Sequence, residues 1–193
     1  MATDIEALAG FDEVLLIRPR RVADIRGYFS EIYREADLSQ RGLHVQWVQE
    51  NESLSVKKGT LRGMHFQKPP RAQAKLVRCV TGAILDVVLD VRPGSSTFGQ
   101  HAGVELSEEN GWQLYVPVGF AHGFCTLTDN CRIAYKTSDY YAPAFEAGVA
   151  FDDPALGIEW PFAAKDLVVS DRDRTLPPLA EIVGALPVHA GKA

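Results

Sequence analysis

Four side chains capable of acid–base chemistry occur in strand-like stretches where apolar residues would be expected. His65 lies in TLRGMHFQ, Lys75 in AKLVRCV, His122 in HGFCTLT and Tyr135 in RIAYKTS. A histidine can act as a general base near neutral pH, a lysine can stabilise an oxyanion, and a tyrosine can donate a proton. Each residue alone also fits a structural role, so the combination carries the prediction. It suits removal of a proton next to a carbonyl group, where negative charge develops on oxygen.

The composition limits the class of protein that could carry this chemistry. The chain has 193 residues, of which 46 % are hydrophobic and 23 % charged, with a formal net charge of −5. These values are typical of one globular domain, and we expect a single domain over residues 1–193. The acidic balance argues against a nucleic-acid partner. An anionic ligand would need a local cluster of Arg and Lys.

The cysteines and the N-terminal segment indicate the compartment. Cys79, Cys125 and Cys131 form no CxxC pair, and this pattern is typical of reduced thiols in a cytoplasmic protein. The first 20 residues place acids before a short apolar run, unlike a signal peptide. No apolar run is long enough to span a bilayer. We therefore expect a cytoplasmic location and no membrane partner.

Short extended segments separated by turn residues dominate the chain. The turn signals include KKG, QKPP, RPGS, EENG and TDN. The predicted strands cover residues 14–18, 28–33, 45–53, 59–67, 74–80, 83–91, 99–106, 112–117, 122–128 and 132–138. Short helices are predicted at 34–42 near the N-terminus and 176–186 near the C-terminus. This pattern favours an all-β antiparallel sandwich or barrel.

In two predicted strands, alternation does not settle which way the polar side chains point. Strict alternation from Thr60 places Arg62 and His65 on opposite faces, so either a bulge near Gly63 re-aims one of them or only one enters the interior. Asp86 interrupts the apolar run AILDVVLDV. Either it faces solvent, or it is buried and paired, since an isolated buried charge is costly. The pattern leaves both interpretations open.

The segment PVGFAHGF, residues 117–124, contains PxGxxH, which resembles the second motif of the cupin superfamily. This resemblance implies a cupin-type jelly-roll barrel or sandwich. Many cupins bind a metal through HxH and a carboxylate in their first motif, but this chain reads MHFQ there, with His65 alone. We therefore expect no metal.

A closer resemblance covers residues from about 11 to 179. The chain resembles the dTDP-4-dehydrorhamnose 3,5-epimerases, a nucleotide-sugar epimerase family of the cupin superfamily. The motifs that carry this resemblance are DIRGYFSE, VQENESLS, KGTLRGMHFQKPPRAQAKLVR, LDVVLDVRPGSSTFG, VPVGFAHGF, YKTSDYYAP, DDPALGIEWP and SDRD.

The resemblance implies residue roles. His65 matches the family's proton acceptor, Asp173 the aspartate that orients it, and Tyr135 the proton donor. By local sequence alone, Asp173 reads as a solvated charge or as a helix N-terminal residue before LPPLAEI. Lys75 and His122 match residues near the sugar and its keto oxygen. Residues that match contacts to the nucleotide, pyrophosphate or sugar are Arg26, Phe29, Glu31, Gln49, Asn51, Arg62, Tyr141, Glu146 and Arg172. Arg172 stands where the family usually has Lys, which changes reach and geometry.

The resemblance also implies a reaction and an assembly. The substrate would be dTDP-4-dehydro-6-deoxyglucose, inverted at C5 and C3 to dTDP-4-dehydro-L-rhamnose, without a cofactor. The product would supply rhamnose or another deoxysugar to a polysaccharide, cell wall or glycosylated metabolite. A homodimer is expected, with residues 26–31 completing the partner's site, since two-fold dimers are the commonest oligomers.

Three alternatives stay open. A single-centre 3- or 5-epimerase on a related dTDP-4-keto-6-deoxysugar would share nearly all these residues. A metal-dependent cupin dioxygenase or isomerase would contain stoichiometric metal. A non-catalytic nucleotide-sugar binding barrel would lack turnover.

Overall fold

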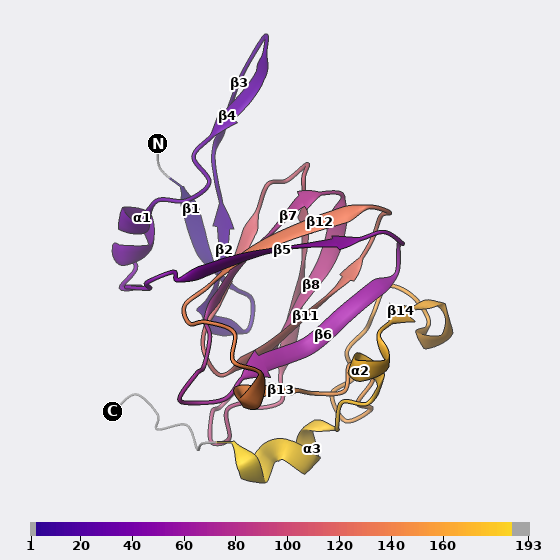
Figure 1. Cartoon of the computed structure of the whole chain (residues 1–193). Coiled ribbons are helices and arrows are strands. Elements are labelled where there is room, and N and C mark those ends of the chain that lie inside the picture. Colours follow the sequence, from indigo (N-terminus) through magenta and orange to yellow (C-terminus); the bar gives the residue numbers. More distant parts are fainter. Residues whose placement is uncertain (1–2, 187–193) are drawn as a thin grey trace.

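The computed structural model describes residues 3–186, and strands make up most of its regular structure (Figure 1). The first sheet has the spatial order β1 (Asp4–Leu8), β2 (Phe11–Arg18), β10 (Gln113–Val116), β7 (Lys75–Thr81), β12 (Cys131–Thr137) and β5 (Gln49–Ser55). The second has β13 (Glu146–Gly148), β6 (Thr60–Gln67), β11 (Phe120–Thr126), β8 (Ala83–Asp90) and β9 (His101–Ser107), with β14 (Val168–Val169) pairing in parallel with β6.

A separate hairpin and several short helices complete the fold. The hairpin consists of β3 (Arg21–Asp24) and β4 (Gly27–Ser30), and it extends away from the two sheets (Figure 1). The helical segments are α1 (Glu35–Ser39), η1 (Pro143–Phe145), η2 (Ala164–Asp166), α2 (Asp171–Arg174), α3 (Leu179–Ile182) and η3 (Val183–Ala185). Of these, α2 and α3 lie on the side of the second sheet (Figure 1).

The main core lies between the two sheets. Val77 and Ile133 of the first sheet pack in one cluster with Ile84 and Val88 of the second. On the other face of β8, Leu89 packs in a second cluster that includes Leu179 of α3. Strand β8 is therefore covered on both faces, which explains its nearly continuous apolar sequence. Alternation places Asp86 on the inward face with Ile84 and Val88.

The all-β prediction is confirmed, while several element bounds differ. The predicted strand at 28–33 ends at Ser30, and the one at 45–53 begins at Gln49. Strands β1, β3, β13 and β14 were not predicted, and each has at most five residues. Such short segments carry too few residues to display an alternating pattern. Both predicted helical regions are helical over shorter ranges.

Two further features bear on the predictions made from composition. Within residues 3–186, no helix is long and apolar enough to cross a membrane. Cys79, Cys125 and Cys131 are free and buried. Burial raises the pKa of the Cys79 and Cys125 thiols to about 12, so both stay protonated near neutral pH.

Candidate active site

A cavity of about 490 Å³ collects nearly all the predicted site residues. It is lined by side chains from both sheets and from the segment that contains α2. The predicted residues among its lining are Gln49, Asn51, Arg62, His65, Lys75, His122, Tyr135, Tyr141, Glu146, Arg172 and Asp173. A larger cavity of about 620 Å³ has a mainly apolar lining. We assign the site to the smaller cavity because the titratable side chains converge there.

A bulge in β6 brings Arg62 and His65 into the same cavity. Phe124 of β11 pairs with Arg62, whereas His122 pairs with His65, so β6 uses one residue more than β11 between these pairs. The extra residue reverses the alternation beyond it. Gly63 has φ +143°, and an added Cβ would lie 2.5 Å from the Gly123 Cα. Of the two alternatives left open by the sequence, the bulge is correct.

The bulge also creates the contact between His65 and Asp173. The Gly63 N–H donates to Asp173 Oδ2 (3.2 Å), and His65 Nε2 lies 2.7 Å from Asp173 Oδ1. A carboxylate can only accept, so Nε2 carries the proton and Nδ1 is left as an acceptor. Burial by itself raises the pKa of Asp173, but the hydrogen bond and charge of His65, together with the Gly63 N–H and the charge of Arg172, outweigh burial, and the pKa is lowered. The local reading of Asp173 as a solvated charge is wrong.

Asp173 is held in place by its own short helix. It is 4 % exposed, and its backbone N–H donates to the Ser170 side chain, which caps the N-terminus of α2. This cap fixes the first turn of the helix and therefore the direction of the Asp173 side chain. The sequence SDRD supplies both the cap and the carboxylate.

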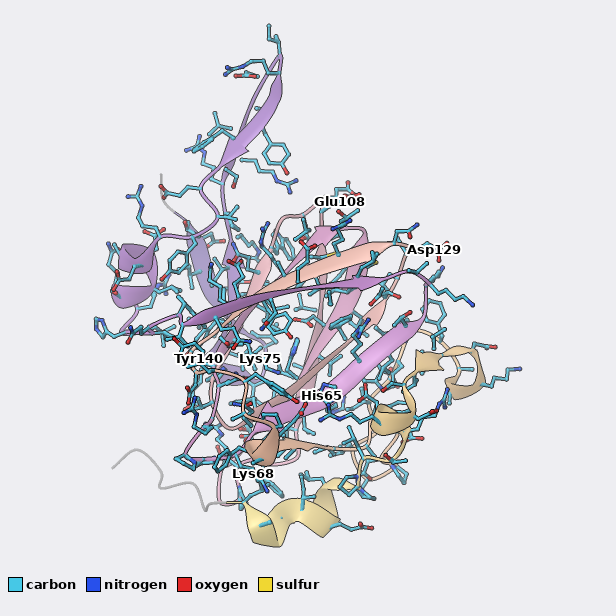
Figure 2. All side chains as sticks on the ribbon, in the orientation of Figure 1. His65, Lys68, Lys75, Glu108, Asp129 and Tyr140 are labelled. Carbon is cyan, nitrogen blue, oxygen red and sulfur yellow. The ribbon has the colours of Figure 1, made fainter. Side chains whose placement is uncertain are left out.

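Lys75 and His122 form the inner wall of the cavity. The Lys75 ammonium donates to the backbone carbonyl of His65 (3.1 Å), and Figure 2 shows the two side chains close together. Burial lowers the pKa of Lys75 to about 8, while the carboxylates of Asp86 and Glu146 oppose this shift. His122 Nε2 lies 2.7 Å from Asp86 Oδ1, and Asp86 is fully buried. The buried, paired interpretation of Asp86 is therefore correct.

Tyr135 enters the cavity from the opposite sheet to His65. It lies on β12, where it pairs with Asn51 of β5 and Val77 of β7. Burial raises the pKa of its phenol, so the hydroxyl is protonated at neutral pH and able to donate. A histidine with an acceptor nitrogen and a protonated phenol thus stand on facing sheets of one cavity.

Polar and aromatic side chains line the outer part of the cavity. Arg62 donates to Ser55 Oγ and to the Leu54 carbonyl of β5. Glu146 accepts from the Tyr141 hydroxyl and pairs with Arg172 (2.5 Å each). Burial raises the pKa of Glu146, but these donors outweigh it and the net shift is downward. Arg172 therefore anchors Glu146, and half-exposed Tyr141 offers a ring on which a base could stack.

The remaining predicted residues do not reach this cavity in the same chain. Arg26 lies at the tip of the β3–β4 hairpin and pairs with Asp24, and its side chain is 84 % exposed. Phe29 is also exposed on the hairpin, and Glu31 pairs with Arg34. Figure 1 shows the hairpin that carries Arg26 and Phe29 directed away from the two sheets.

The sequence reading missed Gln73 and assigned no role to Gln67. The Gln67 side chain donates to the Arg71 and Tyr140 carbonyls and accepts from the Ala142 N–H. Gln73 donates to the Asp139 carbonyl. Both amides hold the loop that carries Tyr141. The signal was present, since each is a polar residue within the 58–78 motif.

The described residues also bear on the metal prediction. Within residues 3–186, no group of three or more His, Cys, Asp or Glu side chains is arranged to hold a metal ion. His65 and His122 each direct Nε2 at an aspartate, which satisfies that nitrogen within the protein and leaves Nδ1 as an acceptor.

Comparison with known proteins gives the family. A family model described as dTDP-4-dehydrorhamnose 3,5-epimerase matches residues 9–181. The chain belongs to the dTDP-4-dehydrorhamnose 3,5-epimerase family. Over 170 residues it is 51 % identical to a dTDP-4-dehydrorhamnose 3,5-epimerase of Sinorhizobium fredii, covering 88 % of this chain and 87 % of the relative. The family assignment makes the chain an enzyme, a carbohydrate epimerase.

Two other relatives refine the comparison. The crystal structure of a dTDP-6-deoxy-D-glucose 3,5-epimerase from Legionella pneumophila, in complex with dTDP-4-keto-L-rhamnose, superposes with a TM-score of 0.92 at 38 % identity, covering 98 % of this chain and 100 % of that one. A dTDP-4-dehydrorhamnose 3-epimerase of Streptomyces niveus is 39 % identical over 182 residues, covering 94 % of this chain and 87 % of the relative. The names of these two relatives therefore differ in the number of sugar carbons that are epimerised, one or two.

Proposed function

We propose that this chain inverts C5 and C3 of dTDP-4-dehydro-6-deoxy-D-glucose to give dTDP-4-dehydro-L-rhamnose. The observation that carries the proposal is the pairing of His65 with Asp173 on one side of a cavity, with Tyr135 on the facing sheet. The family assignment and the ligand named for the Legionella structure support the substrate. The product would enter dTDP-rhamnose or another deoxysugar pathway, and from there a polysaccharide.

In the proposed mechanism His65 Nδ1 removes the proton from a carbon next to the C4 ketone. The electron pair of the broken C–H bond moves to form an enolate, whose oxygen is stabilised by the Lys75 ammonium. Tyr135 then donates its proton to the opposite face of the carbon and inverts the centre. The step conserves the oxidation state of the sugar, so it needs no redox cofactor.

The outer part of the cavity would hold the nucleotide. Arg62 and Arg172 supply guanidinium donors for phosphate oxygens, and Tyr141 supplies a ring for the base. Gln49 and Asn51 of β5 add amide groups on the same side. We propose that Arg172 acts in part through Glu146, which it pairs with in the described chain.

The decisive experiment follows solvent deuterium into the substrate. Wild type, His65→Asn and Tyr135→Phe are incubated with dTDP-4-dehydro-6-deoxyglucose in D₂O, and C3 and C5 are observed by NMR. His65→Asn should lose exchange by about 10²–10⁴-fold, since a positioned base contributes that much. Tyr135→Phe should exchange with little inversion. His101→Asn and Tyr140→Phe, outside the cavity lining, are the matched controls. Near-normal exchange in His65→Asn would refute the base assignment.

A second candidate is a single-centre epimerase. It is favoured by the name of the Streptomyces niveus relative, a 3-epimerase. The same experiment separates the two, because a double epimerase incorporates deuterium at both carbons and a single-centre enzyme at one.

We further propose a homodimer and a cytoplasmic location. Ile25 and Phe29 are 105 % and 65 % exposed on the β3–β4 hairpin, and large exposed apolar side chains are typical of an interface. A second copy of the chain would place Arg26 and Phe29 beside the partner's cavity. The buried, free thiols suit a reducing compartment.

A further inference from the structure

A second histidine–carboxylate pair lies beside the first, and the proposed mechanism leaves its carboxylate unused. His122 and His65 are direct partners across β11 and β6. His122 pairs with Asp86 of β8, as His65 pairs with Asp173 of α2. The two pairs differ in exposure, since the His122 side chain is 8 % exposed and the His65 side chain 29 %.

We propose that Asp86 is a positioning residue that holds His122 neutral with its proton on Nε2, so that Lys75 alone supplies positive charge to the enolate oxygen. Asp86 also provides the countercharge that keeps Lys75 protonated. The proposal rests on the proposed epimerase function and assigns the charges at the keto-oxygen end of that site.

The hydrogen bond fixes the tautomer of His122. Because the Asp86 carboxylate can only accept, the Nε2–H of His122 must donate to Oδ1. The other ring nitrogen, Nδ1, is then an acceptor on a side chain that lines the cavity. Burial lowers the pKa of His122, Asp86 opposes this shift, and Lys75 and His65 reinforce it. The ring therefore accepts a hydrogen bond from Lys75 or a sugar hydroxyl instead of donating one to the ketone.

The second carboxylate oxygen of Asp86 is the basis for its proposed electrostatic link to Lys75. Asp86 Oδ2 is buried and has no hydrogen-bond partner within residues 3–186. A buried anionic oxygen without a donor is costly unless a cation lies nearby. We assign Lys75 as that cation, because it lines the same cavity as His122 and its ammonium donates to the backbone carbonyl of His65, the cross-strand partner of His122. The charge of Asp86 also raises the pKa of Lys75 against the effect of burial. The other titratable or charged side chains around the cavity are Arg62, His65, His122, Tyr135, Tyr141, Glu146, Arg172 and Asp173.

The first measurement is the tautomer of His122 in the wild-type protein. The protein is labelled with ¹⁵N-histidine, and the His122 signals are assigned by their loss in His122→Gln. At pH 7.5 we expect a neutral ring with the proton on Nε2. A ring protonated on Nδ1, or on both nitrogens, overturns the proposal. This readout does not depend on activity, so it stands even if the epimerase function fails in the deuterium experiment.

The second measurement compares the pH profiles of wild type and Asp86→Asn. Loss of the carboxylate should lower kcat at pH 7.5 by about tenfold or more and leave KM within about twofold, since Asp86 does not line the nucleotide end. The alkaline decline of kcat should move to lower pH by about one unit or more, because an opposite charge nearby shifts a pKa by that amount. A wild-type profile in folded Asp86→Asn contradicts the proposal.

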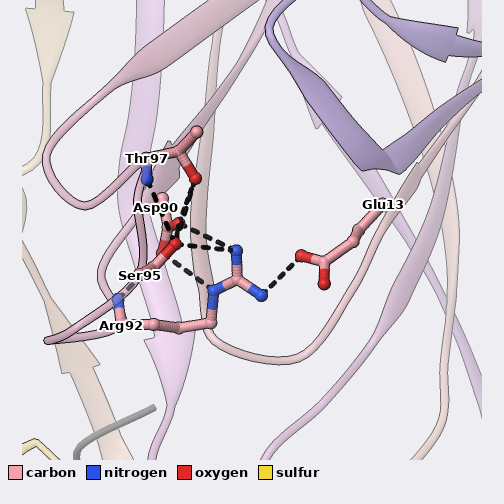
Figure 3. Close-up of polar contacts among 5 residues, drawn as sticks. All are labelled: Glu13, Asp90, Arg92, Ser95 and Thr97. Atoms are coloured by element: carbon pink, nitrogen blue, oxygen red, sulfur yellow. Dashed lines mark hydrogen bonds and ion pairs between the residues drawn. The ribbon is translucent and has the colours of Figure 1, made fainter. Parts of the chain in front are cut away.

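Asp90→Asn is the matched control. Asp90 lies four residues further on β8, is also fully buried, and pairs with Arg92 away from the cavity (Figure 3). Loss of the Asp90 carboxylate should reduce stability without changing the tautomer of His122 or the pH at which kcat declines on the alkaline side. If Asp86→Asn does not fold, the wild-type spectrum still decides the question.

Discussion

The choice of nitrogen on His65 determines whether this residue can be a base. Asp173 accepts from the Gly63 N–H and from His65 Nε2, so it aligns the ring through two contacts on the same strand. The free nitrogen, Nδ1, then belongs to a ring whose rotation is restricted. A bare histidine in the same cavity would populate both tautomers and several orientations. The orientation of the proposed base therefore depends on α2 as much as on β6.

Asp173→Asn should separate orientation from binding. The amide can donate to Nε2, which would shift the His65 proton to Nδ1 and block proton acceptance. We expect kcat to fall by about 10²–10⁴-fold, with the dissociation constant of dTDP changed little. Steady-state kinetics and titration calorimetry measure both quantities. Asp171→Asn, an exposed residue of the same helix, is the control and should retain activity. A large loss of dTDP affinity would instead make Asp173 a structural residue.

Much of the site could be predicted at the residue scale, because its members occur in long, ordered motifs. Asp173 could be placed only by resemblance, since SDRD alone fits a solvated helix start. Asp86 was recognised as unusual, but alternation could not say which face of β8 was inward. That face is decided by α3 and its neighbours, which cover the outer side of β8. Local sequence contains no information on which distant segment will cover a strand.

At the scale of elements, the bulge in β6 is the feature on which the site depends. It directs the side chains of Arg62 and His65 into the same cavity, and it leaves the Gly63 N–H free to donate to Asp173. A residue with a side chain would fit badly at position 63, because β6 and β11 approach closely there. The sequence left a bulge near Gly63 as one of two alternatives, because alternation placed Arg62 and His65 on opposite faces, and the pairing with β11 locates it.

Gly63→Ala should damage stability and activity together. The added Cβ would lie 2.5 Å from the Gly123 backbone, and φ is +143°. We expect a loss of more than about 1 kcal/mol in the free energy of unfolding, as for alanine at a positive φ, with a further cost from the clash. Urea denaturation measures it. Gly184→Ala, where a Cβ meets nothing within 4 Å, should change stability by less than about 0.5 kcal/mol. Equal effects of the two variants would contradict this account.

A second element-level feature is the polar cluster at the end of β8. Asp90 accepts from Arg92, Ser95 and Thr97, and Arg92 also pairs with Glu13 of β2 (Figure 3). The cluster fixes the turn after β8 and joins it to the first sheet. Burial raises the pKa of Asp90, but the hydrogen bonds from Arg92 and the hydroxyls outweigh it and lower the pKa overall. The ionised form is therefore favoured by folding.

Asp90→Asn should destabilise the protein in a pH-dependent way. Because the folded-state pKa is lowered, the stabilisation is fully present above the unfolded pKa of about 3.9 and is lost as pH falls through the folded value. We expect a cost of about 3 kcal/mol near pH 7 that shrinks below about pH 4. Thermal unfolding of both proteins between pH 3 and 7 measures the difference. Exposed Asp152→Asn is the control. A difference independent of pH would show that the charge of Asp90 is not the cause.

At the scale of the whole molecule, the described chain separates the predicted site residues into two groups. One group lines the cavity, and the other lies on a hairpin that extends away from it. The sequence predicted a strand there but gave no direction for the hairpin, because its direction depends on contacts outside the segment. The exposed apolar side chains of Ile25, Tyr28 and Phe29 are costly in water. A partner chain would remove that cost and unite the two groups.

Complementation between two inactive variants tests this arrangement. One variant is His65→Asn, with an intact hairpin, and the other carries Arg26→Ala and Phe29→Ala, with an intact cavity. In a mixed dimer with exchanged hairpins, one site combines the intact cavity with the intact hairpin, and the other site has both defects. Purified mixed dimers should therefore recover about half of wild-type activity, from one working site in two. If each hairpin served its own cavity, both sites would be defective and no activity would return. A fully active monomer in sedimentation would also contradict the arrangement, since the hairpin of a single chain points away from its own cavity.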